Sequence, residues 1–200
     1  MLNEENANAI YAVYAYCRVA DDAVDVYDSP EKLKELENKL IDFDNGKTPN
    51  EPLWRALKNV FEKYNMDITP FYEMIVGQKM DINFTQPETQ DELLEYCYYV
   101  AGTVGKMLLP ILASKNIDFI DTNKIRLGEA MRITNILRDI GEDFDNGRIY
   151  IPVEVMKKFN YSPKDLKYKS INENFIKMWE FEAKEAQKMY DDFCTLIDNI

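Results

Sequence analysis

Two aspartate-rich stretches decide the fold of this chain: Arg18-Val19-Ala20-Asp21-Asp22-Ala23-Val24-Asp25 near its start, and Asn135-Ile136-Leu137-Arg138-Asp139-Ile140-Gly141-Glu142-Asp143 further along. Both have the spacing of a helix. An α-helix has 3.6 residues per turn, so Asp21 lies one turn from Asp25, and Asn135, Asp139 and Asp143 follow one another along one line. Like charges at this spacing destabilise an isolated helix by about 0.2–0.5 kcal/mol per pair. We therefore predict two helices whose carboxylates face a bound cation.

The donor atoms available in these stretches favour a hard cation. The chain has no histidine, and neither stretch contains a cysteine. Oxygen ligands alone suit Mg2+, with Mn2+ as the alternative, and Mg2+ usually binds through a few carboxylates together with substrate phosphates. Arg18 and Arg138 give each stretch a fixed cation suited to phosphate oxygens. The combination predicts a diphosphate held by metal ions between two helices.

A solvated acidic helix face is the alternative interpretation, and it is the better one for either stretch taken alone. Two stretches, each with an arginine and each within apolar sequence, reverse that judgement. A calcium loop is excluded at Asp143-Phe144-Asp145-Asn146-Gly147, because its glycine comes one position too early for an EF-hand. The same pentapeptide occurs at residues 42–46, and we interpret the glycine as a left-handed residue that ends a helix.

The composition indicates one domain over residues 1–200, since 46% hydrophobic residues suffice for a sizeable core. A net charge of −12 argues against nucleic acid as a partner. Cys17, Cys97 and Cys194 are odd in number and widely spaced, which favours reduced thiols in a cytoplasmic protein. No long apolar run and no basic signal region occur. We expect a soluble protein that an apolar substrate brings transiently to a membrane surface; no oligomeric state is predicted.

Helical periodicity dominates, and the fold class predicted is all-α. Capping signals mark several helix starts: Ser29-Pro30, Thr69-Pro70, Ser162-Pro163, and Thr89 with Glu92. The predicted helices cover residues 3–27, 31–44, 50–65, 70–83, 90–114, 121–145 and 171–199, with short helical pieces between 152 and 168. Small residues at Ala101, Gly102 and Gly105 would let a neighbouring helix or a ligand approach the backbone, and helix packing is the favoured explanation.

Three motifs together resemble those of the squalene and phytoene synthase family, the head-to-head prenyltransferases. The first aspartate motif of the family resembles residues 18–25, and the second resembles residues 135–143 followed by Gly147-Arg148-Ile149-Tyr150-Ile151-Pro152. Its central pocket motif resembles Tyr96-Cys97-Tyr98-Tyr99-Val100-Ala101-Gly102-Thr103-Val104-Gly105. The resemblance covers nearly the whole chain and is strongest to bacterial dehydrosqualene (diapophytoene) synthases and phytoene synthases. It implies the helical bundle of the isoprenoid synthases, or class I terpenoid synthases.

The resemblance also implies roles for individual residues. Metal and diphosphate binding would fall to Asp21, Asp25, Asn135, Asp139 and Asp143, and direct contact with the diphosphates to Arg18 and Arg138. Three tyrosines would line the reaction centre, with core packing as their alternative role: Tyr14, Tyr96 and Tyr150. The remaining substrate-binding residues would be Asp81, Gly105 and those of a hydrocarbon channel: Ala101, Val104, Leu108, Leu112 and Leu127.

The implied reaction joins two farnesyl diphosphates through presqualene diphosphate, and proton loss then gives dehydrosqualene (diapophytoene) for carotenoid biosynthesis. NADPH is not expected, because the chain has no nucleotide-binding glycine pattern. The first alternative is phytoene synthesis from geranylgeranyl diphosphate. Further alternatives are a non-catalytic remnant that binds Mg2+ and a prenyl diphosphate, and a helical interaction module with solvated acidic faces.

Two departures from the family pattern accompany the resemblance. Arg132 stands where the family usually has glutamine, and it either adds a charge near the metal face or turns outward. The family's opening helix has no counterpart before Met1, and its last helices have none after Ile200. The resemblance therefore implies a fold truncated at both ends.

Overall fold

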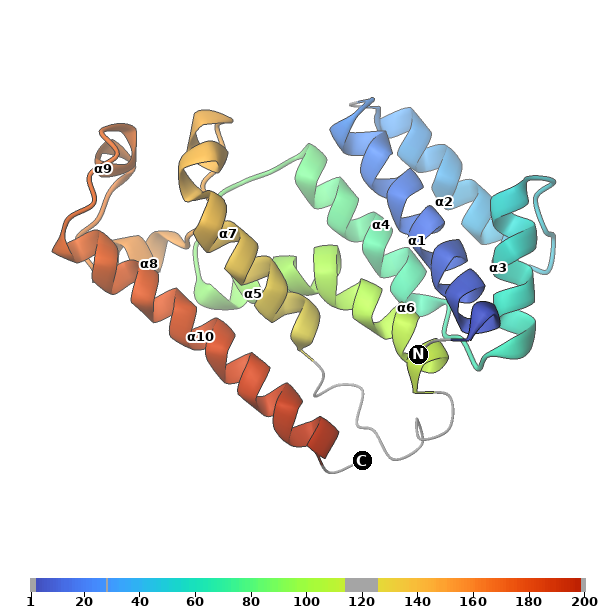
Figure 1. Ribbon diagram of the computed structural model, residues 1–200. Coiled ribbons are helices and arrows are strands. Elements are labelled where there is room, and N and C mark those ends of the chain that lie inside the picture. The colour runs from blue at the N-terminus through green and yellow to red at the C-terminus, as the bar shows by residue number, and fades with distance from the viewer. Residues whose placement is uncertain (1–2, 28, 114–125, 199–200) are drawn as a thin grey trace. The chain divides into compact units, whose positions relative to one another are not determined.

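The computed structural model describes residues 3–27, 29–113 and 126–198 (Figure 1), and the capping signals and apolar periodicity produce helices joined by turns and loops in this part of the chain. The described residues contain no strand, so the all-α prediction is confirmed. The elements, in chain order, are α1 (Glu4–Asp25), α2 (Pro30–Asp44), α3 (Pro52–Lys63), α4 (Thr69–Ile82), α5 (Gln90–Cys97), a π-helical turn η1 (Tyr98–Gly102), α6 (Thr103–Leu112), α7 (Leu127–Asp145), α8 (Val153–Lys158), α9 (Pro163–Lys167) and α10 (Glu173–Asp198).

Most helix ends form as the sequence predicts. The side chains of Ser29, Thr89 and Ser162 accept hydrogen bonds from the first turns of α2, α5 and α9. Thr69 differs: it is the first residue of α4, and its backbone N–H donates to Asp67 Oδ1 at 2.8 Å. The prediction that Thr69 caps α4 is therefore wrong, and Asp67 accepts one N–H of the first turn.

The two copies of Asp-Phe-Asp-Asn-Gly end α2 and α7 in the same way. Gly46 and Gly147 have φ of 80° and 78°, in the left-handed region. At the first copy, the N–H of Lys47 donates to the carbonyl of Asp42, which closes a Schellman motif; the second copy makes the equivalent bonds. The prediction that these glycines end helices is confirmed.

The helix predicted over residues 90–114 is interrupted. A π-helical turn separates α5 from α6, and local periodicity does not signal it, because residues on both sides keep helical spacing. Residue 114 of this predicted helix and residues 121–125 of the next one lie outside the described residues.

The contacts between Cα atoms divide the chain into two compact units. The first contains α1–α4 and α6, and the second contains α5, η1 and α7–α10. The single domain expected over residues 1–200 stays a prediction.

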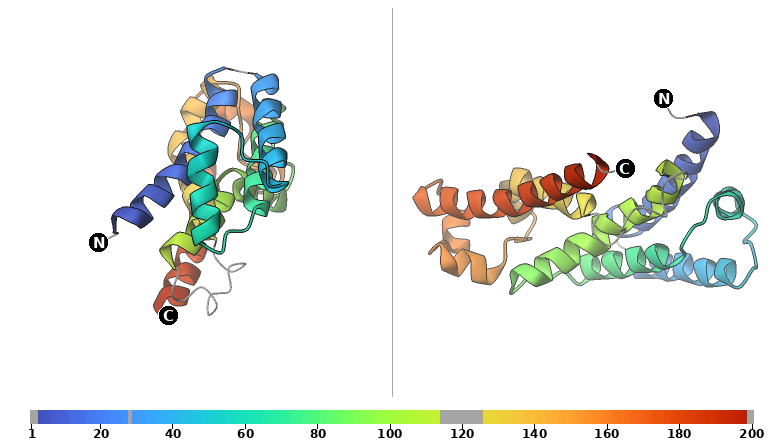
Figure 2. Two further views of the ribbon diagram at one scale, coloured as in Figure 1. Left: turned by 90° about the vertical axis from the view of Figure 1, so that its right-hand side faces the viewer. Right: turned by 90° about the horizontal axis from the view of Figure 1, so that it is seen from below.

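In the first unit, α1 packs against α2, α3, α4 and α6, and Figures 1 and 2 show α1, α2 and α4 side by side. The buried face of α1 has the helical spacing Ala9, Val13, Tyr16 and Ala20. Tyr16 is fully buried, and its hydroxyl donates to the carbonyl of Phe71 at 2.9 Å. This core holds the first aspartate stretch at the C-terminal end of α1.

In the second unit, α10 runs along α7, as both figures show. The indole N–H of Trp179 donates to the carbonyl of Leu137 at 3.1 Å, and Met178, Ala186 and Met189 are buried. This packing holds α7, which carries the second aspartate stretch. None of the described helices is both long and apolar enough to cross a membrane.

Candidate functional site

The first aspartate stretch presents two different faces of α1. Asp21 is half-buried, and Gln78 of α4 donates to its Oδ1 at 2.7 Å. Burial, and then the charge of Asp25 one turn along, raise the pKa of Asp21 to about 6, although the Gln78 bond opposes the rise. The repulsion that the sequence predicts between Asp21 and Asp25 is therefore present, and a cation would relieve it.

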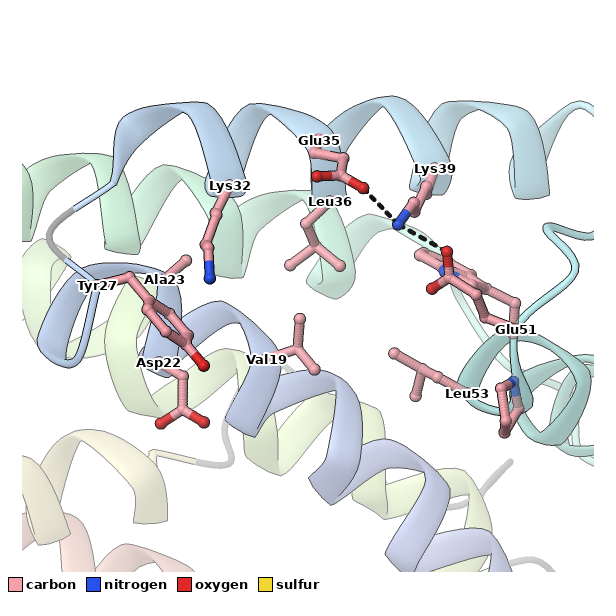
Figure 3. A pocket seen from close by; sticks show the side chains of 12 residues that line it. Val19, Asp22, Ala23, Tyr27, Lys32, Glu35, Leu36, Lys39, Glu51 and Leu53 are labelled. Carbon is pink, nitrogen blue, oxygen red and sulfur yellow. Dashed lines mark ion pairs between the residues drawn. The ribbon is translucent and has the colours of Figure 1, made fainter.

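Asp22 lies on another face, because each residue of an α-helix turns about 100° from the one before it. Arg18 Nη2 contacts Asp22 Oδ1 at 2.8 Å. Figure 3 shows Asp22 and Tyr27 at one end of a groove of about 440 Å³ between α1, α2 and the start of α3. Asp21 is not among the residues that line this groove, so the groove is separate from the carboxylate face that the sequence predicts for metal.

The charged groups of the groove are largely paired with one another. Lys39 bridges Glu35 and Glu51 at 2.7 Å each, and Lys32 Nζ lies 3.0 Å from the centre of the Tyr27 ring (Figure 3). A diphosphate would have to displace both glutamates to reach Lys39. The groove is consequently a poor candidate for the predicted diphosphate site.

The second aspartate stretch has an arginine fork at its centre. Arg138 donates through Nε and Nη2 to the two oxygens of Asp139, at 2.7 and 2.6 Å. These bonds hold the pKa of the Asp139 carboxyl below its ordinary value. Asn135 and Asp143 are half-buried on the same helix, and burial raises the pKa of Asp143. The stretch thus offers an amide and two carboxylates in different electrostatic states.

Aromatic rings and two arginines gather beside α7 in the second unit. Tyr96 and Tyr150 are buried and stacked, with ring centres 5.4 Å apart and planes at 27°. Arg132 Nη2 donates to the Tyr96 hydroxyl at 2.7 Å, and Arg148 Nη1 donates to the Tyr150 hydroxyl at 2.9 Å. Phe84 meets Tyr150 edge to face, with ring centres 4.8 Å apart. The structure therefore brings together two of the three predicted tyrosines.

The other predicted residues have varied surroundings. Tyr14 is 63% exposed on α1, and Leu112 is 54% exposed at the end of α6. Val104 and Leu108 are partly buried against the core of the first unit. Four more are half-buried: Asp81 on α4, Ala101 in η1, Gly105 on α6 and Leu127 at the start of α7. Their roles in substrate binding stay predictions.

Close helix packing accounts for part of the central motif. A Cβ added to Gly128 of α7 would lie 2.5 Å from the carbonyl oxygen of Ala101, and one added to Gly102 would lie 2.9 Å from Glu129 Oε2. Nothing lies within 4 Å of a Cβ at Gly105. The favoured explanation, approach by a neighbouring helix, therefore holds for Ala101 and Gly102 but not for Gly105.

Sequence reasoning missed two polar residues with defined partners. Gln78 orients Asp21, yet in the sequence of α4 it is an ordinary polar residue that directly precedes Lys79. Glu182 of α10 is fully buried and receives a hydrogen bond from Gln90 Nε2 at 2.9 Å. Gln78 lies 57 positions and Gln90 lies 92 positions from its partner, so only the fold reveals these contacts.

The donor set fits a hard divalent ion, although it supplies few ligands in any one place. Within the described residues, no group of three or more His, Cys, Asp or Glu side chains could hold a metal. Mg2+ needs only one or two carboxylates when phosphates and waters complete its shell. Burial, and then the charge of Asp25, raise the pKa of Asp21, and a bound cation would favour the charged carboxylate against both effects.

Comparison with known proteins gives a consistent result. A family model described as squalene/phytoene synthase matches residues 1–200. The chain is 38% identical over 196 residues to the 4,4'-diapophytoene synthase of Staphylococcus haemolyticus, covering 96% of this chain and 69% of the relative. It is 34% identical over 201 residues to the chloroplastic phytoene synthase 1 of Solanum lycopersicum. That alignment covers 96% of this chain and 48% of the relative.

Comparison with solved structures points to the same family. A dehydrosqualene synthase crystallised with a ligand superposes with a TM-score of 0.88 at 47% identity, over 96% of this chain and 67% of that one. The chain thus spans between 48% and 69% of the length of these relatives. The helical isoprenoid synthase fold predicted from the motifs is confirmed. Because the family model extends over all 200 residues and a relative more than one third identical is aligned over most of its length, the chain belongs to the squalene/phytoene synthase family.

Proposed function

We propose that this chain is a prenyltransferase that condenses two farnesyl diphosphates head to head, through presqualene diphosphate, to dehydrosqualene. The observation that carries the proposal is an arginine–aspartate pair on each of two helices, Arg18 with Asp22 and Arg138 with Asp139, in a chain of this family. Each pair stands beside a further carboxylate one helical turn away. Such an arrangement suits a polyanionic substrate that arrives with metal ions.

Arg18 and Arg138 are the groups that would bind the diphosphate. Guanidinium groups bind phosphate oxygens through two parallel hydrogen bonds, as Arg138 now binds the two oxygens of Asp139. When a diphosphate arrives, Arg138 exchanges the carboxylate for phosphate oxygens, and Asp139 becomes available to a cation. Arg18 and Asp22 separate in the same way. Before the substrate binds, each ion pair neutralises the charge of its own arginine and aspartate.

Five residues would hold Mg2+, whose chemical contribution is to take up the negative charge that develops on a departing diphosphate: Asp21, Asp25, Asn135, Asp139 and Asp143. The allylic cation left behind must be kept from water, and apolar side chains from α6 suit that purpose. Tyr96 and Tyr150 supply polarisable rings and hydroxyl groups beside α7.

The length of the substrate separates two candidates. Similarity to a diapophytoene synthase and to a dehydrosqualene synthase structure favours the fifteen-carbon substrate. Similarity to phytoene synthases keeps geranylgeranyl diphosphate as the second candidate. A non-catalytic chain that binds Mg2+ and a prenyl diphosphate without turnover is the remaining alternative.

The test is product identification. The purified chain is incubated with Mg2+ and either prenyl diphosphate, with and without NADPH, and the extracted hydrocarbon is identified by mass spectrometry. We expect dehydrosqualene from farnesyl diphosphate, no product with EDTA, and no effect of NADPH. Phytoene as the preferred product would replace the first candidate with the second. Metal-dependent binding without any hydrocarbon would support the non-catalytic alternative.

A further inference from the structure

We propose that Arg132 is a positioning residue that holds Tyr96 in place at the reaction centre. This inference rests on the proposed function for its role, and on the geometry of the second unit for the contact itself. The sequence left two alternatives for Arg132: a charge added near the metal face, or a side chain turned outward. The structure favours a third, in which the guanidinium acts through a tyrosine.

The contact has two components. Arg132 Nη2 donates to the Tyr96 hydroxyl at 2.7 Å, and the guanidinium carbon lies 5.4 Å from the Tyr96 ring centre and 5.1 Å from that of Tyr150. Both distances lie within the roughly 6 Å reach of a cation–π interaction. One arginine therefore fixes the hydroxyl end of Tyr96 and also contacts the stacked pair of rings.

Tyr150 is held by a different arginine. Arg148 Nη1 donates to its hydroxyl at 2.9 Å, and Phe84 packs against its ring. Tyr96 and Tyr150 thus form a stacked pair in which each hydroxyl accepts a hydrogen bond from its own arginine. Removal of the Arg132 guanidinium leaves the Tyr150 hydroxyl bonded to Arg148, and this separation of the two hydrogen bonds makes the proposal testable.

The position of Arg132 connects this pair to the aspartate stretch. Arg132 precedes Asn135, Asp139 and Asp143 by 3, 7 and 11 residues, which is the spacing of one helix face. The Tyr96 hydroxyl is therefore fixed at the N-terminal end of the row of predicted metal ligands. A tyrosine free to rotate would lose that placement, and small displacements at a reaction centre are costly to rate.

A planar guanidinium is required for this geometry. It donates in its plane and stacks through its faces, whereas a lysine ammonium is a compact charge without a planar fork. We therefore expect Arg132→Lys to recover little of the arginine's effect. Arg132→Met removes the guanidinium and keeps an unbranched apolar side chain in place of the aliphatic part of the arginine.

The experiment is a pair of double-mutant cycles. The first combines Arg132→Met with Tyr96→Phe, and the second combines Arg132→Met with Tyr150→Phe, which keeps the ring and removes a hydroxyl that Arg132 does not bind. We expect each change in the first cycle to lower kcat by about tenfold with KM changed less than about threefold, and the double variant to be little worse than either single one. In the second cycle the Tyr150 ring that Arg132 contacts is kept, and the coupling on kcat should be clearly smaller than in the first.

Two readouts separate failure of this inference from failure of the proposed function. Urea unfolding of the same variants needs no activity, and coupling between Arg132→Met and Tyr96→Phe in it is expected whether or not hydrocarbon is made. Arg55→Met is the control, because Arg55 is exposed on α3 and donates to Asn50. Independent effects of Arg132 and Tyr96 in both readouts would overturn the contact. Coupling in unfolding together with independent effects on kcat, or a rise in KM alone, would overturn the positioning role. Absence of any hydrocarbon from the unmodified chain would instead overturn the proposed function.

Discussion

The buried carboxylate of Glu182 gives the stability of this protein a definite pH dependence. Glu182 is fully buried in α10, and its only described hydrogen bond comes from Gln90 at 2.9 Å. Burial raises its pKa from 4.5 to about 7, with the Gln90 bond opposing the rise. The folded state therefore binds a proton that the unfolded chain releases from about pH 4.5 upward.

The sign of the effect follows from this difference in proton binding. Below pH 4.5 both states are protonated, and the full contribution of the buried acid to stability is present. As the pH rises through 7 the folded state loses its proton as well, and the contribution is gone. One pKa unit corresponds to about 1.4 kcal/mol, so the rise from 4.5 to about 7 corresponds to about 3 kcal/mol.

Glu182→Gln tests this reasoning, because glutamine has nearly the same shape and no charge. Urea unfolding at pH 5, 6, 7 and 8 should show a stability gain for the variant over the wild type that grows from about 1 kcal/mol at pH 5 to about 3 kcal/mol at pH 8. Glu180→Gln removes the same charge from an exposed position on the same helix and should give no such trend. A gain that is constant across the pH series, or a loss at pH 8, would refute the burial of a protonated Glu182.

Three further predictions concern the site and its support. Asp139→Ala and Asp25→Ala should each lower turnover on the order of a hundredfold or more without changing the far-UV circular dichroism; near-full turnover in either would contradict its role as a ligand. Gly128→Ala should lower the free energy of unfolding by about 1–3 kcal/mol, because its Cβ would lie 2.5 Å from a backbone oxygen of η1. Gly141→Ala, on the same helix with nothing within 4 Å, should raise that free energy by up to about 1 kcal/mol, and equal effects would show that the close approach is unimportant. Tyr16→Phe removes a buried hydrogen bond to α4 and should cost about 1 kcal/mol in urea unfolding, so an unchanged midpoint would contradict that bond.

Local signals predicted most of the fold. Ser29 and Ser162 cap α2 and α9 as predicted, and Gly46 and Gly147 end α2 and α7. These interactions were predictable because each involves residues only a few positions apart. Thr69 is an exception among these local signals. A threonine before a proline resembles a cap, but Thr69 is already inside α4, and its own N–H donates to the side chain of Asp67.

The candidate site was predicted only in part, because its important contacts join distant positions. Helical spacing correctly placed Asp21 near Asp25, whose charge it feels. Helical spacing could not predict that Gln78 of α4 would donate a hydrogen bond to Asp21 of α1. Nor could it predict that Asp22 would line a separate groove. Nor does the polar sequence of α10 distinguish Glu182 from its exposed neighbours.

The π-helical turn explains why a tyrosine meets Arg132 at all. On α7, Gly128 and Arg132 lie four residues apart, which is one α-helical turn. Their partners are Ala101 and Tyr96, which lie five residues apart. The π-helical turn begins at Tyr98, between these two residues, and its wider winding, with hydrogen bonds from i to i+5, lets both contacts reach the same helix, α7. In an uninterrupted α-helix the residue one turn before Ala101 would be Cys97, and Tyr96 would point about 100° away from α7. The backbone irregularity and the arginine therefore act on the same side chain, and a change that regularised the turn would displace Tyr96 as surely as the loss of Arg132.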